Sequence, residues 1–347
     1  MKSQPKISVV MTVFNAEQYL REAMDSILGQ SFADFEFIIV DNKSTDGSVE
    51  IIKSYSDERI RLIENAVNVG QTKALNIGIE HSRAFLIARM DADDISFPQR
   101  FQVQYDFLNK HPDIAVVGSF RIDIDQNGKQ LRVFKGPADP IRLRCCLAGS
   151  GDLTYWCLSH PTVMIRKEVL GAVGFYREPA DSPFGFPQDY DLWSRLIVKG
   201  VKFANIGEPL LKYRIVPRSE SRNDMARLLA HRLRITQTKI KSVLPDLKSE
   251  DVLSLSQMLE FQLVEPSRKL QNIYGLFDKY FDAFMAEQRD LGLVRDLRER
   301  MKFYYLPVVF SKDKKQGMVR FFDFIVRRPS FLLDFKFYCK FLKVNML

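Results

Sequence analysis

Three aspartates, Asp91, Asp93 and Asp94, directly follow an apolar run that is expected to form a strand. On an extended chain the side chains at positions i and i+2 project to the same side, so Asp91 and Asp93 can face one ligand together. Two carboxylates in one crevice repel each other, and a hard cation beside a phosphate group removes that repulsion. The spacing therefore indicates a site for Mg²⁺ or Mn²⁺. The alternative is a polar loop in which Asp94 or Ser96 caps the next helix.

Two polar loops are expected to flank the same site. The first is Thr-Val-Phe-Asn at 12–15, and the second is Asp-Asn-Lys-Ser-Thr-Asp-Gly at 41–47. Both carry hydrogen-bonding groups that could contact the edge of a base or a ribose. Each loop also has a purely structural interpretation, because Asn15 and Asp46 are good helix caps. The sequence lacks the glycine-rich signatures of dinucleotide-binding dehydrogenases and P-loop phosphotransferases, which removes the main support for both classes.

The elements that must position these residues alternate regularly up to Met90. Short apolar, β-branched runs are typical of buried parallel strands, and the segments between them carry apolar residues at helical spacing. Asn15 is expected to cap the first helix, Gly29 to end it, and Asp46 to cap the second. The expected strands are 7–13, 35–40, 59–64 and 84–90, and the third helix is 71–82. This alternation predicts a doubly wound, mostly parallel α/β sheet that binds ligands at the carboxyl ends of its strands.

The rest of the chain has a more mixed pattern. Ser96 and Pro98 are expected to open a helix that runs through Leu108, and the turn at 127–128 to join a hairpin. The other expected elements are strands 115–125, 130–134, 162–166, 201–206 and 210–215 and a helix at 189–199. Beyond Ser219 the pattern is helical. We therefore predict a main domain over residues 1–220 and a helical C-terminal region over 221–347.

The composition is that of a soluble globular protein, with 46% hydrophobic and 27% charged residues in 347. The apolar run near the N-terminus is too short for a signal peptide or a membrane span. The four cysteines have neither Cys-x-x-Cys spacing nor a disulfide framework, so no disulfide and no thiolate zinc site is expected. These features predict a cytoplasmic protein.

The segment 310–347 combines basic residues with phenylalanines and carries most of the formal net charge of +8. Large apolar groups between Lys and Arg suit the headgroup region of an anionic membrane. Because no run reaches the roughly 18 uncharged residues of a spanning helix, we predict peripheral contact with the inner face of a membrane. The alternative is a helical segment that packs its aromatic face on the main domain. The near-neutral main domain gives no reason to expect nucleic acid as a partner.

Four motifs in order resemble the inverting family-2 glycosyltransferases of GT-A fold, over residues 5–221. They are Ser-Val-Val-Met-Thr-Val-Phe-Asn at 8–15, Val-Asp-Asn-x-Ser-Thr-Asp-Gly at 40–47, Asn-Val-Gly with Ala-Leu-Asn-Ile-Gly within 68–78, and Ala-Arg-Met-Asp-Ala-Asp-Asp-Ile-Ser-x-Pro at 88–98. The resemblance implies that Asp93 holds the metal and that Asp91 lies beside it, toward the nucleoside. The residues that it implies for binding the nucleotide-sugar are Thr12, Val13, Phe14, Asn15, Asp41, Asn42, Gly70, Lys73 and Asp91.

The resemblance also implies a general base in the segment Gln-Asp-Tyr-Asp-Leu-Trp at 188–193. Asp189 matches that base. Attack from the face opposite the leaving phosphate needs a fixed acceptor for the hydroxyl proton, as in inverting glycosidases. The alternative for Asp189 is a helix N-cap, and Asp191 is expected only to favour the first helical turn.

Four positions qualify the resemblance. The segment Tyr-Arg-Ile-Val at 213–216 stands where many relatives have Tyr-Arg-x-His, so a histidine that helps to hold metal or pyrophosphate is lost or replaced. Leu75 and Gln188 replace the Arg and Glu of relatives, which leaves the donor contacts open. His160, in a Ser-His-Pro-Thr segment, either faces the active site or makes a hydrogen bond in the core.

The resulting prediction is a metal-dependent inverting glycosyltransferase. It would move a sugar from a nucleotide diphosphate donor, expected to be a UDP-sugar, to a hydroxyl of a glycan or lipid-linked acceptor in cell-surface polysaccharide or glycolipid synthesis. A catalytically degenerate protein that binds nucleotide-sugar or scaffolds an assembly is the alternative, motivated by Val216. A sugar-phosphate nucleotidyltransferase would need a glycine-rich loop with arginine after the first strand, and the sequence has none.

Overall fold

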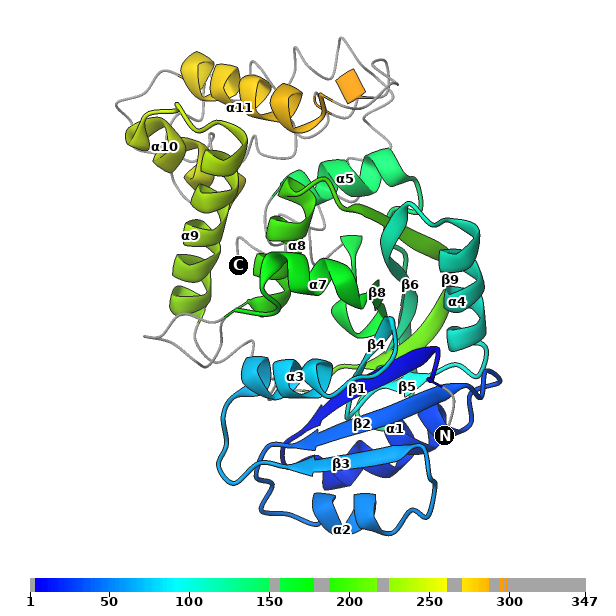
Figure 1. Cartoon of the computed structure of the whole chain (residues 1–347). Helices are drawn as coiled ribbons and strands as arrows, with labels where there is room; N and C mark the ends of the chain where they lie inside the picture. The colour runs from blue at the N-terminus through cyan, green and yellow to red at the C-terminus, as the bar shows by residue number, and fades with distance from the viewer. Residues whose placement is uncertain are drawn as a thin grey trace.

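The computed structural model describes residues 4–149, 157–177, 187–216, 225–260, 270–286, 294–295 and 298. The described part is built around a nine-stranded mixed sheet with helices on both faces (Figure 1). Within these ranges, three longer helices follow the last strand. This is the doubly wound α/β architecture with a helical C-terminal region that the sequence predicts.

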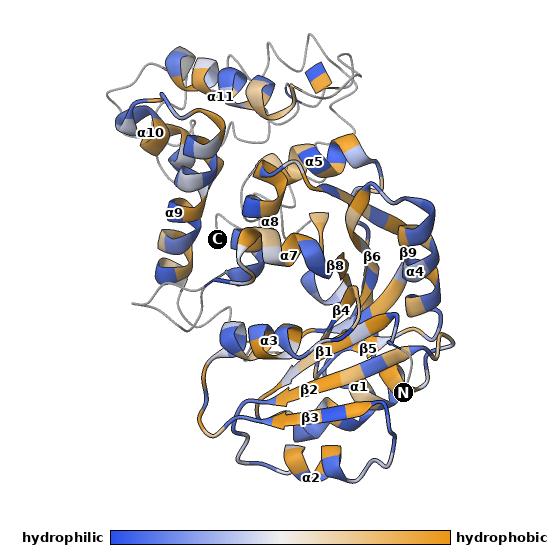
Figure 2. Cartoon of the chain, in the orientation of Figure 1, coloured by the Kyte–Doolittle hydropathy of each residue, from blue (hydrophilic) through white to orange (hydrophobic). Residues whose placement is uncertain are grey.

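The first half of the sheet is parallel, in the order β3-β2-β1-β4. Its strands are β1 (Ile7–Val13), β2 (Phe35–Asp41), β3 (Ile60–Glu64) and β4 (Leu86–Asp91). The connecting helices are α1 (Glu17–Leu28), α2 (Ser48–Lys53) and α3 (Gln71–Glu80). All of β2 is buried, and its residues 37–40 form an unbroken apolar run, as expected where both faces of a strand are covered (Figure 2).

The second half of the sheet has the order β4-β8-β6-β9-β5, and β7 pairs with β6. Its strands are β5 (Ile95–Ser96), β6 (Ile114–Ile124), β7 (Gln130–Phe134), β8 (Met164–Arg166) and β9 (Lys202–Arg214). The short β8 is antiparallel to both β4 and β6, whereas β9 runs parallel to β6. The helices are α4 (Arg100–Lys110), α5 (Pro140–Ala148), α7 (Lys167–Val173) and α8 (Gln188–Val198), with a 3₁₀ turn at His160–Thr162.

The expectation of two strands at 201–206 and 210–215 is wrong, because the structure has one strand, β9. Ile206 lies opposite Ser119 and Pro209 opposite Phe120, so β9 has two more residues than its partner between these pairs. The two extra residues, Gly207 and Glu208, are exposed. A bulge that carries Gly and Pro looks like a strand end in the sequence, although the pairing continues on both sides.

The predicted caps are partly wrong. Helix α1 begins after Ala16 without a side-chain cap, and Asn15 adopts a φ of 50°. Asp46 precedes the cap position of α2, and its carboxylate accepts the backbone N–H groups of Ser48 and of Glu17 at 3.0 Å each. It therefore serves the N-termini of two helices. Ser96 lies in β5, and no side chain caps α4.

Among the described residues, the two largest hydrophobic clusters lie on opposite faces of the sheet. The first contains Val9 and Met11 of β1 and is covered by α1 and α4. The second contains Val10 of β1 and extends through α3, α5, α7 and α8. The alternation along β1 follows from the two-residue period of a strand.

The helical region comprises α9 (Met225–Val243), α10 (Ser249–Leu259) and α11 (Leu270–Phe284). Figure 1 shows α9 beside α8, with α10 and α11 beyond it, and α9 contacts α8, α10 and α11. Buried residues of these helices belong to the same hydrophobic core as Trp193 of α8. The region is thus continuous with the core of the sheet.

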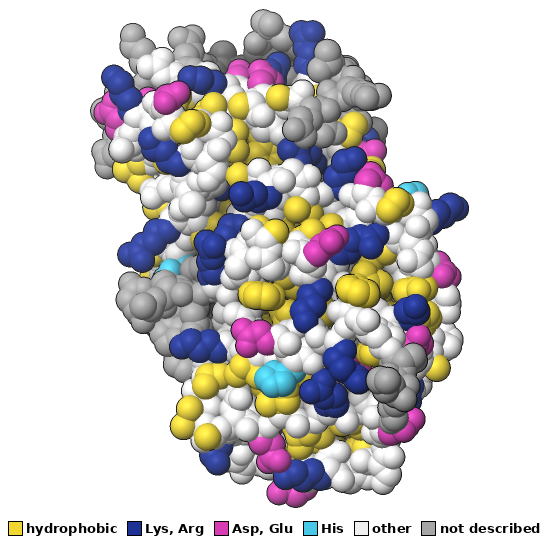
Figure 3. Space-filling model, viewed as in Figure 1, with side chains coloured by type: hydrophobic (Ala, Val, Ile, Leu, Met, Phe, Trp, Pro, Cys, Tyr) yellow, Lys and Arg dark blue, Asp and Glu magenta, His cyan; other side chains and the backbone are white. Residues whose placement is uncertain are grey.

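The described residues test only one part of the membrane prediction, the absence of a spanning helix. Lys and Arg side chains are dispersed over the face in Figure 3, with Asp and Glu among them. No helix within the described ranges is long and apolar enough to cross a membrane. The segment 310–347, which carries the membrane prediction, lies outside the described residues.

Candidate active site

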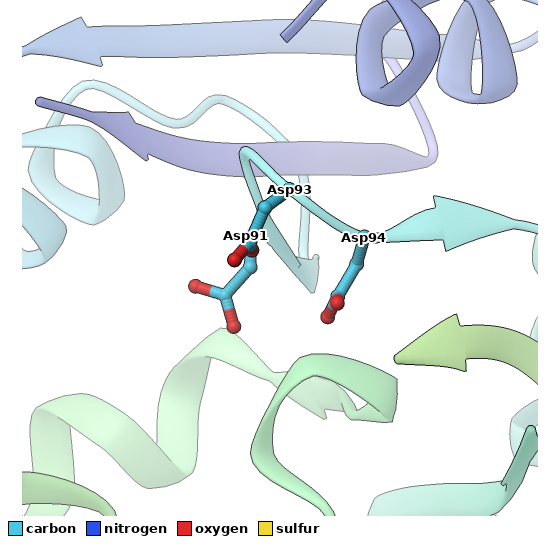
Figure 4. Close-up of side chains that lie close together, drawn as sticks. All are labelled: Asp91, Asp93 and Asp94. Carbon is cyan, nitrogen blue, oxygen red and sulfur yellow. The ribbon is translucent and has the colours of Figure 1, made fainter. Parts of the chain in front are cut away.

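The aspartate cluster lies where β4 ends. Asp91 is the last residue of β4 and stands opposite Thr12 of β1. One carboxylate oxygen from each of Asp91, Asp93 and Asp94 lies within 4.8 Å of the others. The three side chains point to the same side of the turn after β4 (Figure 4). Asp94, which the alternative interpretation of the sequence made a helix cap, is therefore part of the cluster.

Without a cation, the three carboxylates are unfavourable in their charged forms, because they are close together and largely buried. Burial, together with the charge of Asp91, raises the pKa of Asp93 to about 6. Burial and the charges of Asp93 and Asp91 raise the pKa of Asp94 well above its ordinary value. The Oδ1 of Asp94 accepts the backbone N–H of Arg214 at 2.9 Å, whereas its buried Oδ2 has no hydrogen-bond partner in the described part of the chain. This donor set fits Mg²⁺ or Mn²⁺, because a hard cation binds carboxylate oxygens and neutralises their repulsion.

Arg89 is a functional candidate that the sequence interpretation missed. Its guanidinium is buried in β4 and makes an ion pair with Asp91. Burial alone would lower the pKa of Arg89, but the charge of Asp91 raises it above its ordinary value. The signal in the sequence is a single charged residue inside the apolar run of β4, since buried arginines are almost always paired.

Arg214 fixes the turn that carries the cluster. Its Nε donates to the backbone oxygen of Asp93 at 2.8 Å, and its Nη2 makes an ion pair with Glu22 at 2.6 Å. The guanidinium also stacks on the ring of Tyr19, with Cζ 4.4 Å from the ring centroid. Within the segment 213–216, it is therefore the arginine that contacts the turn carrying the aspartate cluster.

Asp189 lies in the first turn of α8 and is half-buried. Pro187 occupies the cap position and no side chain of the described residues caps the helix, so Asp189 is not an N-cap. Its Oδ1 accepts the backbone N–H of Tyr190 at 2.7 Å. Burial raises the pKa of Asp189 and the charge of Asp91 acts in the same direction, whereas Arg89 lowers it. Asp189 is thus close enough to the cluster for their charges to interact.

Neighbouring residues of α8 have structural partners. Gln188 donates from Nε2 to Oε1 of Gln71 at 3.0 Å, which joins the start of α8 to the start of α3. Asp191 makes an ion pair with Arg195 at 2.7 Å, one helical turn later. Asp191 therefore has a role inside its own helix, as the sequence indicates.

His160 makes a hydrogen bond in the core. Its Nε2 lies 2.7 Å from the hydroxyl of Tyr176, and both side chains are buried. Burial lowers the pKa of His160 well below its ordinary value, so the ring stays neutral. Burial also raises the pKa of Tyr176, and the charges of Asp189 and Asp91 contribute to that shift. His160 therefore supports a tyrosine that lies near the two carboxylates.

The loops after β1 and β2 bind each other. The Oδ1 of Asn15 accepts the backbone N–H of Thr45 at 2.8 Å, and the backbone N–H of Asn15 donates to Ser44 at 3.0 Å. Val13, which is buried, accepts the backbone N–H of Asn42 at 2.8 Å. Asn15 thus holds the two loops together, in a left-handed conformation that Asn tolerates.

Other predicted nucleoside contacts differ in exposure. Phe14 is 46% exposed and Lys73 lies exposed in the first turn of α3, so both side chains can reach a ligand. The carboxylate of Asp41 is buried and accepts the backbone N–H groups of Lys43 and Ser44.

Asn42 holds a third loop. Its buried Oδ1 accepts the Nδ2 of Asn65 at 3.1 Å and the backbone N–H of Val69 at 3.0 Å, and its Nδ2 donates to Asn68 at 2.7 Å. Asn68 in turn accepts the backbone N–H of Gly70, whose φ of 83° favours glycine. Asn42 and Gly70 therefore shape the loop before α3.

Comparisons with known proteins show a family and a fold to which the chain is similar. The chain matches a family model described as Glycosyl transferase family 2 over residues 8–170. It is similar to the uncharacterized glycosyltransferase MJ1057 of Methanocaldococcus jannaschii, with 37% identity over 216 residues, 61% of this chain and 71% of that protein. It is also similar to the O-antigen biosynthesis glycosyltransferase WbnJ of Escherichia coli, with 31% identity over 224 residues, 63% of this chain and 84% of that protein.

A further relative and a solved structure extend the comparison. The amylovoran biosynthesis glycosyltransferase AmsE of Erwinia amylovora is 28% identical over 220 residues, 60% of this chain and 75% of that protein. The crystal structure of S. aureus TarS 1-349 in complex with UDP-GlcNAc has a TM-score of 0.59 and 16% identity, over 90% of this chain and 92% of that chain. At this identity the likeness shows a shared fold.

Proposed function

This chain belongs to glycosyl transferase family 2 and is a glycosyltransferase of GT-A fold, and from that premise we propose that it transfers a sugar from a UDP-sugar to an acceptor hydroxyl with inversion. The observation that supports the proposal is the charge interaction of Asp189 with Asp91, which belongs to the cluster of Asp91, Asp93 and Asp94. A metal-binding cluster and a separate carboxylate are the two groups that inverting transfer needs.

Each group has a distinct task. The cluster would hold Mg²⁺ or Mn²⁺, which supplies positive charge to the departing diphosphate. Asp189 accepts the proton of the attacking hydroxyl, and its raised pKa makes it a stronger base than an ordinary aspartate. Arg89 makes an ion pair with Asp91, so its positive charge offsets one negative charge of the cluster. The joined loops at 12–15 and 41–47, with Gly70 and Lys73, would bind the nucleoside.

A catalytically degenerate protein is the second candidate, because Val216 stands where many relatives have histidine. The presence of Asp91, Asp93 and Asp189 and the contact of Arg214 with the turn favour an active enzyme. An assay of nucleoside diphosphate release with metal distinguishes the two, since a protein that only binds the donor releases none.

The biological setting follows from the relatives. WbnJ is named as an O-antigen biosynthesis glycosyltransferase, and AmsE as an amylovoran biosynthesis glycosyltransferase. We therefore place this enzyme in polysaccharide or glycolipid synthesis, with a glycan or lipid-linked sugar as acceptor. Residues 1–220 would form its catalytic domain and 221–347 its helical region.

Donor binding is tested by a thermal-shift screen of nucleotides and nucleotide-sugars with and without Mn²⁺. A UDP-sugar with Mn²⁺ should raise the melting temperature, because a ligand at a hundred times its Kd stabilises the folded state by about 2.7 kcal/mol. Mn²⁺ alone and UDP-sugar alone are the controls and should give smaller shifts. A response to another nucleotide and none to UDP would overturn the UDP assignment, and no response to any nucleotide-sugar would contradict donor binding.

Peripheral membrane contact is tested by flotation with anionic liposomes. The full chain should float at low salt and lose binding as salt rises, because Lys and Arg meet anionic lipid through screened charges. A truncation after Lys302 should remain in the soluble fraction. If the full chain also stays soluble at low salt, the segment 310–347 does not bind membranes, and packing on the protein is the better interpretation.

A further inference from the structure

A buried polar network joins the helix of Asp189 to the helical region. Its centre is the hydroxyl of Tyr190, the residue next to Asp189. That hydroxyl lies 2.7 Å from Oγ1 of Thr236, accepts Nζ of Lys239 at 3.1 Å and donates to Oε1 of Glu260 at 3.1 Å. Thr236 and Lys239 belong to α9, and Glu260 directly follows α10. Two helices of the C-terminal region therefore meet the first turn of α8 at one atom.

The network is charged as well as buried. Lys239 and Glu260 are 2% exposed each, and Glu260 also pairs with Arg232 at 2.8 Å. Burial lowers the pKa of Lys239 to about 7, although Glu260 acts in the opposite direction. Buried charges are tolerated only where their partners are held in place, so each contact fixes the geometry of the others.

The same region binds the end of α5, which packs against α8. Lys239 donates from Nζ to the carbonyl oxygens of Leu147 at 3.2 Å and Gly149 at 2.6 Å. The hydroxyl of Tyr280, on α11, donates to the carbonyl of Ala148 at 2.9 Å. The last carbonyls of a helix have no partner within it, so α9 and α11 here supply donors that the helix lacks.

We propose that the helical region positions the base. Resting on the proposed function of Asp189, the inference is that Tyr190 and Lys239 hold the first turn of α8, and hence Asp189, at a fixed place relative to the metal cluster. Neither residue is required to touch substrate. Catalysis is sensitive to such placement, since a shift of about 1 Å in a reacting group can cost about a hundredfold in rate. An unrestrained first turn would leave Asp189 near the site but poorly aligned.

A network that only stabilised the fold would give a different experimental result from one that positions Asp189. If the contacts only stabilised the fold, removing one would lower the melting temperature and leave the folded fraction fully active. If they position Asp189, removal should lower kcat while the Kd of the donor stays the same, because Asp189 acts on the acceptor proton and not on donor binding.

The test uses Tyr190→Phe in the full chain, with Tyr280→Phe as the matched control. Both variants remove one buried hydroxyl, but the hydroxyl of Tyr280 contacts α5 rather than α8. We expect Tyr190→Phe to lower kcat about tenfold or more with donor Kd within about twofold, and Tyr280→Phe to keep kcat within about twofold. Thr236→Val, which removes a hydroxyl at nearly constant shape, provides a second variant should Tyr190→Phe fold poorly.

A double-mutant cycle separates this inference from the assignment of the base. In the Asp189→Asn background, Tyr190→Phe should cause almost no further loss of kcat, because residues that act as a unit are non-additive. A full loss in that background, or equal kcat changes in Tyr190→Phe and Tyr280→Phe, would overturn the positioning role. Normal turnover of Asp189→Asn by itself would instead overturn the proposed base.

Discussion

Asp189→Asn is expected to lower kcat by about 10²–10⁴-fold while the affinity for the donor stays nearly unchanged, the usual scale for a positioned general base. Asparagine keeps the shape and the acceptor oxygen that binds the backbone N–H of Tyr190. It cannot take up the proton of an attacking hydroxyl. Steady-state turnover with saturating metal and donor, together with calorimetric titration of the donor, measures the two quantities separately.

The pH profile gives an independent test of the same assignment. Burial raises the pKa of Asp189, so kcat should fall with decreasing pH at a higher pH than for an ordinary aspartate with a pKa of about 3.9. Asp189→Asn should lack this acid limb. A variant with near wild-type turnover, or with an unchanged acid limb, would show that Asp189 is not the base.

The thermal stability of Asp189→Asn helps to explain why its turnover is lower. A carboxyl whose pKa is raised by folding binds more protons when folded, so its contribution to stability is lost as pH rises through the folded pKa. At neutral pH the charge of Asp189 therefore lowers the stability of the folded protein. Asp189→Asn should melt no lower than the wild-type protein, which would exclude unfolding as the cause of its lower turnover.

Local signals account for most of the fold that the sequence predicts. The bounds of β1 and β7 agree residue for residue with the expectation. Each is a β-branched or alternating run next to a loop or turn, and this pattern depends on neighbours in the chain. The position of Asp91 at the end of β4 follows from the same local logic, because a parallel strand ends where the apolar run ends.

Long-range contacts explain what the sequence does not predict. The insertion of β8 between β4 and β6 brings together segments far apart in the chain, and its three residues carry no signal for a partner. Asn15 does not occupy the cap position of α1, because it makes hydrogen bonds with the loop after β2 instead. A cap preference is real but weak, and a better partner across the fold overrides it.

The site shows the same division. Asp93 and Asp189 are visible in the sequence by resemblance, but the orientation of Asp94 is set by the backbone N–H of Arg214, a residue of β9. Tyr190 in the sequence is one more aromatic residue of a helix. Its contacts with Thr236, Lys239 and Glu260 exist only because α9 packs on α8 and α10 packs on α9.

The second large effect is expected for Asp93→Ala, which should weaken Mn²⁺ binding in the presence of UDP by more than about a hundredfold. A hard cation loses one charged oxygen beside the diphosphate, and loss of even an outer partner of a metal ligand costs about 10-fold to 100-fold. Calorimetric titration of Mn²⁺ into the protein with UDP measures the effect. Asp93→Asn, which retains an oxygen but not the charge, should lie between the wild-type protein and Asp93→Ala.

Asp113→Ala is the control for the loss of a carboxylate as such, because Asp113 is exposed and pairs only with Lys202 at 3.0 Å in the described structure. Its Mn²⁺ affinity should equal that of the wild-type protein. An unchanged affinity in Asp93→Ala would remove Asp93 from the metal site.

The stability of Asp93→Ala should change sign with the metal. Burial and Asp91 raise the pKa of Asp93 to about 6, so near pH 7 its charge destabilises the metal-free protein. Removing that charge should leave the melting temperature without metal equal to or above that of the wild-type protein. With Mn²⁺ and UDP the order should reverse, because the wild-type protein gains the free energy of binding and the variant does not. A variant that melts below the wild-type protein under both conditions would show that Asp93 stabilises the fold and does not serve as a metal ligand.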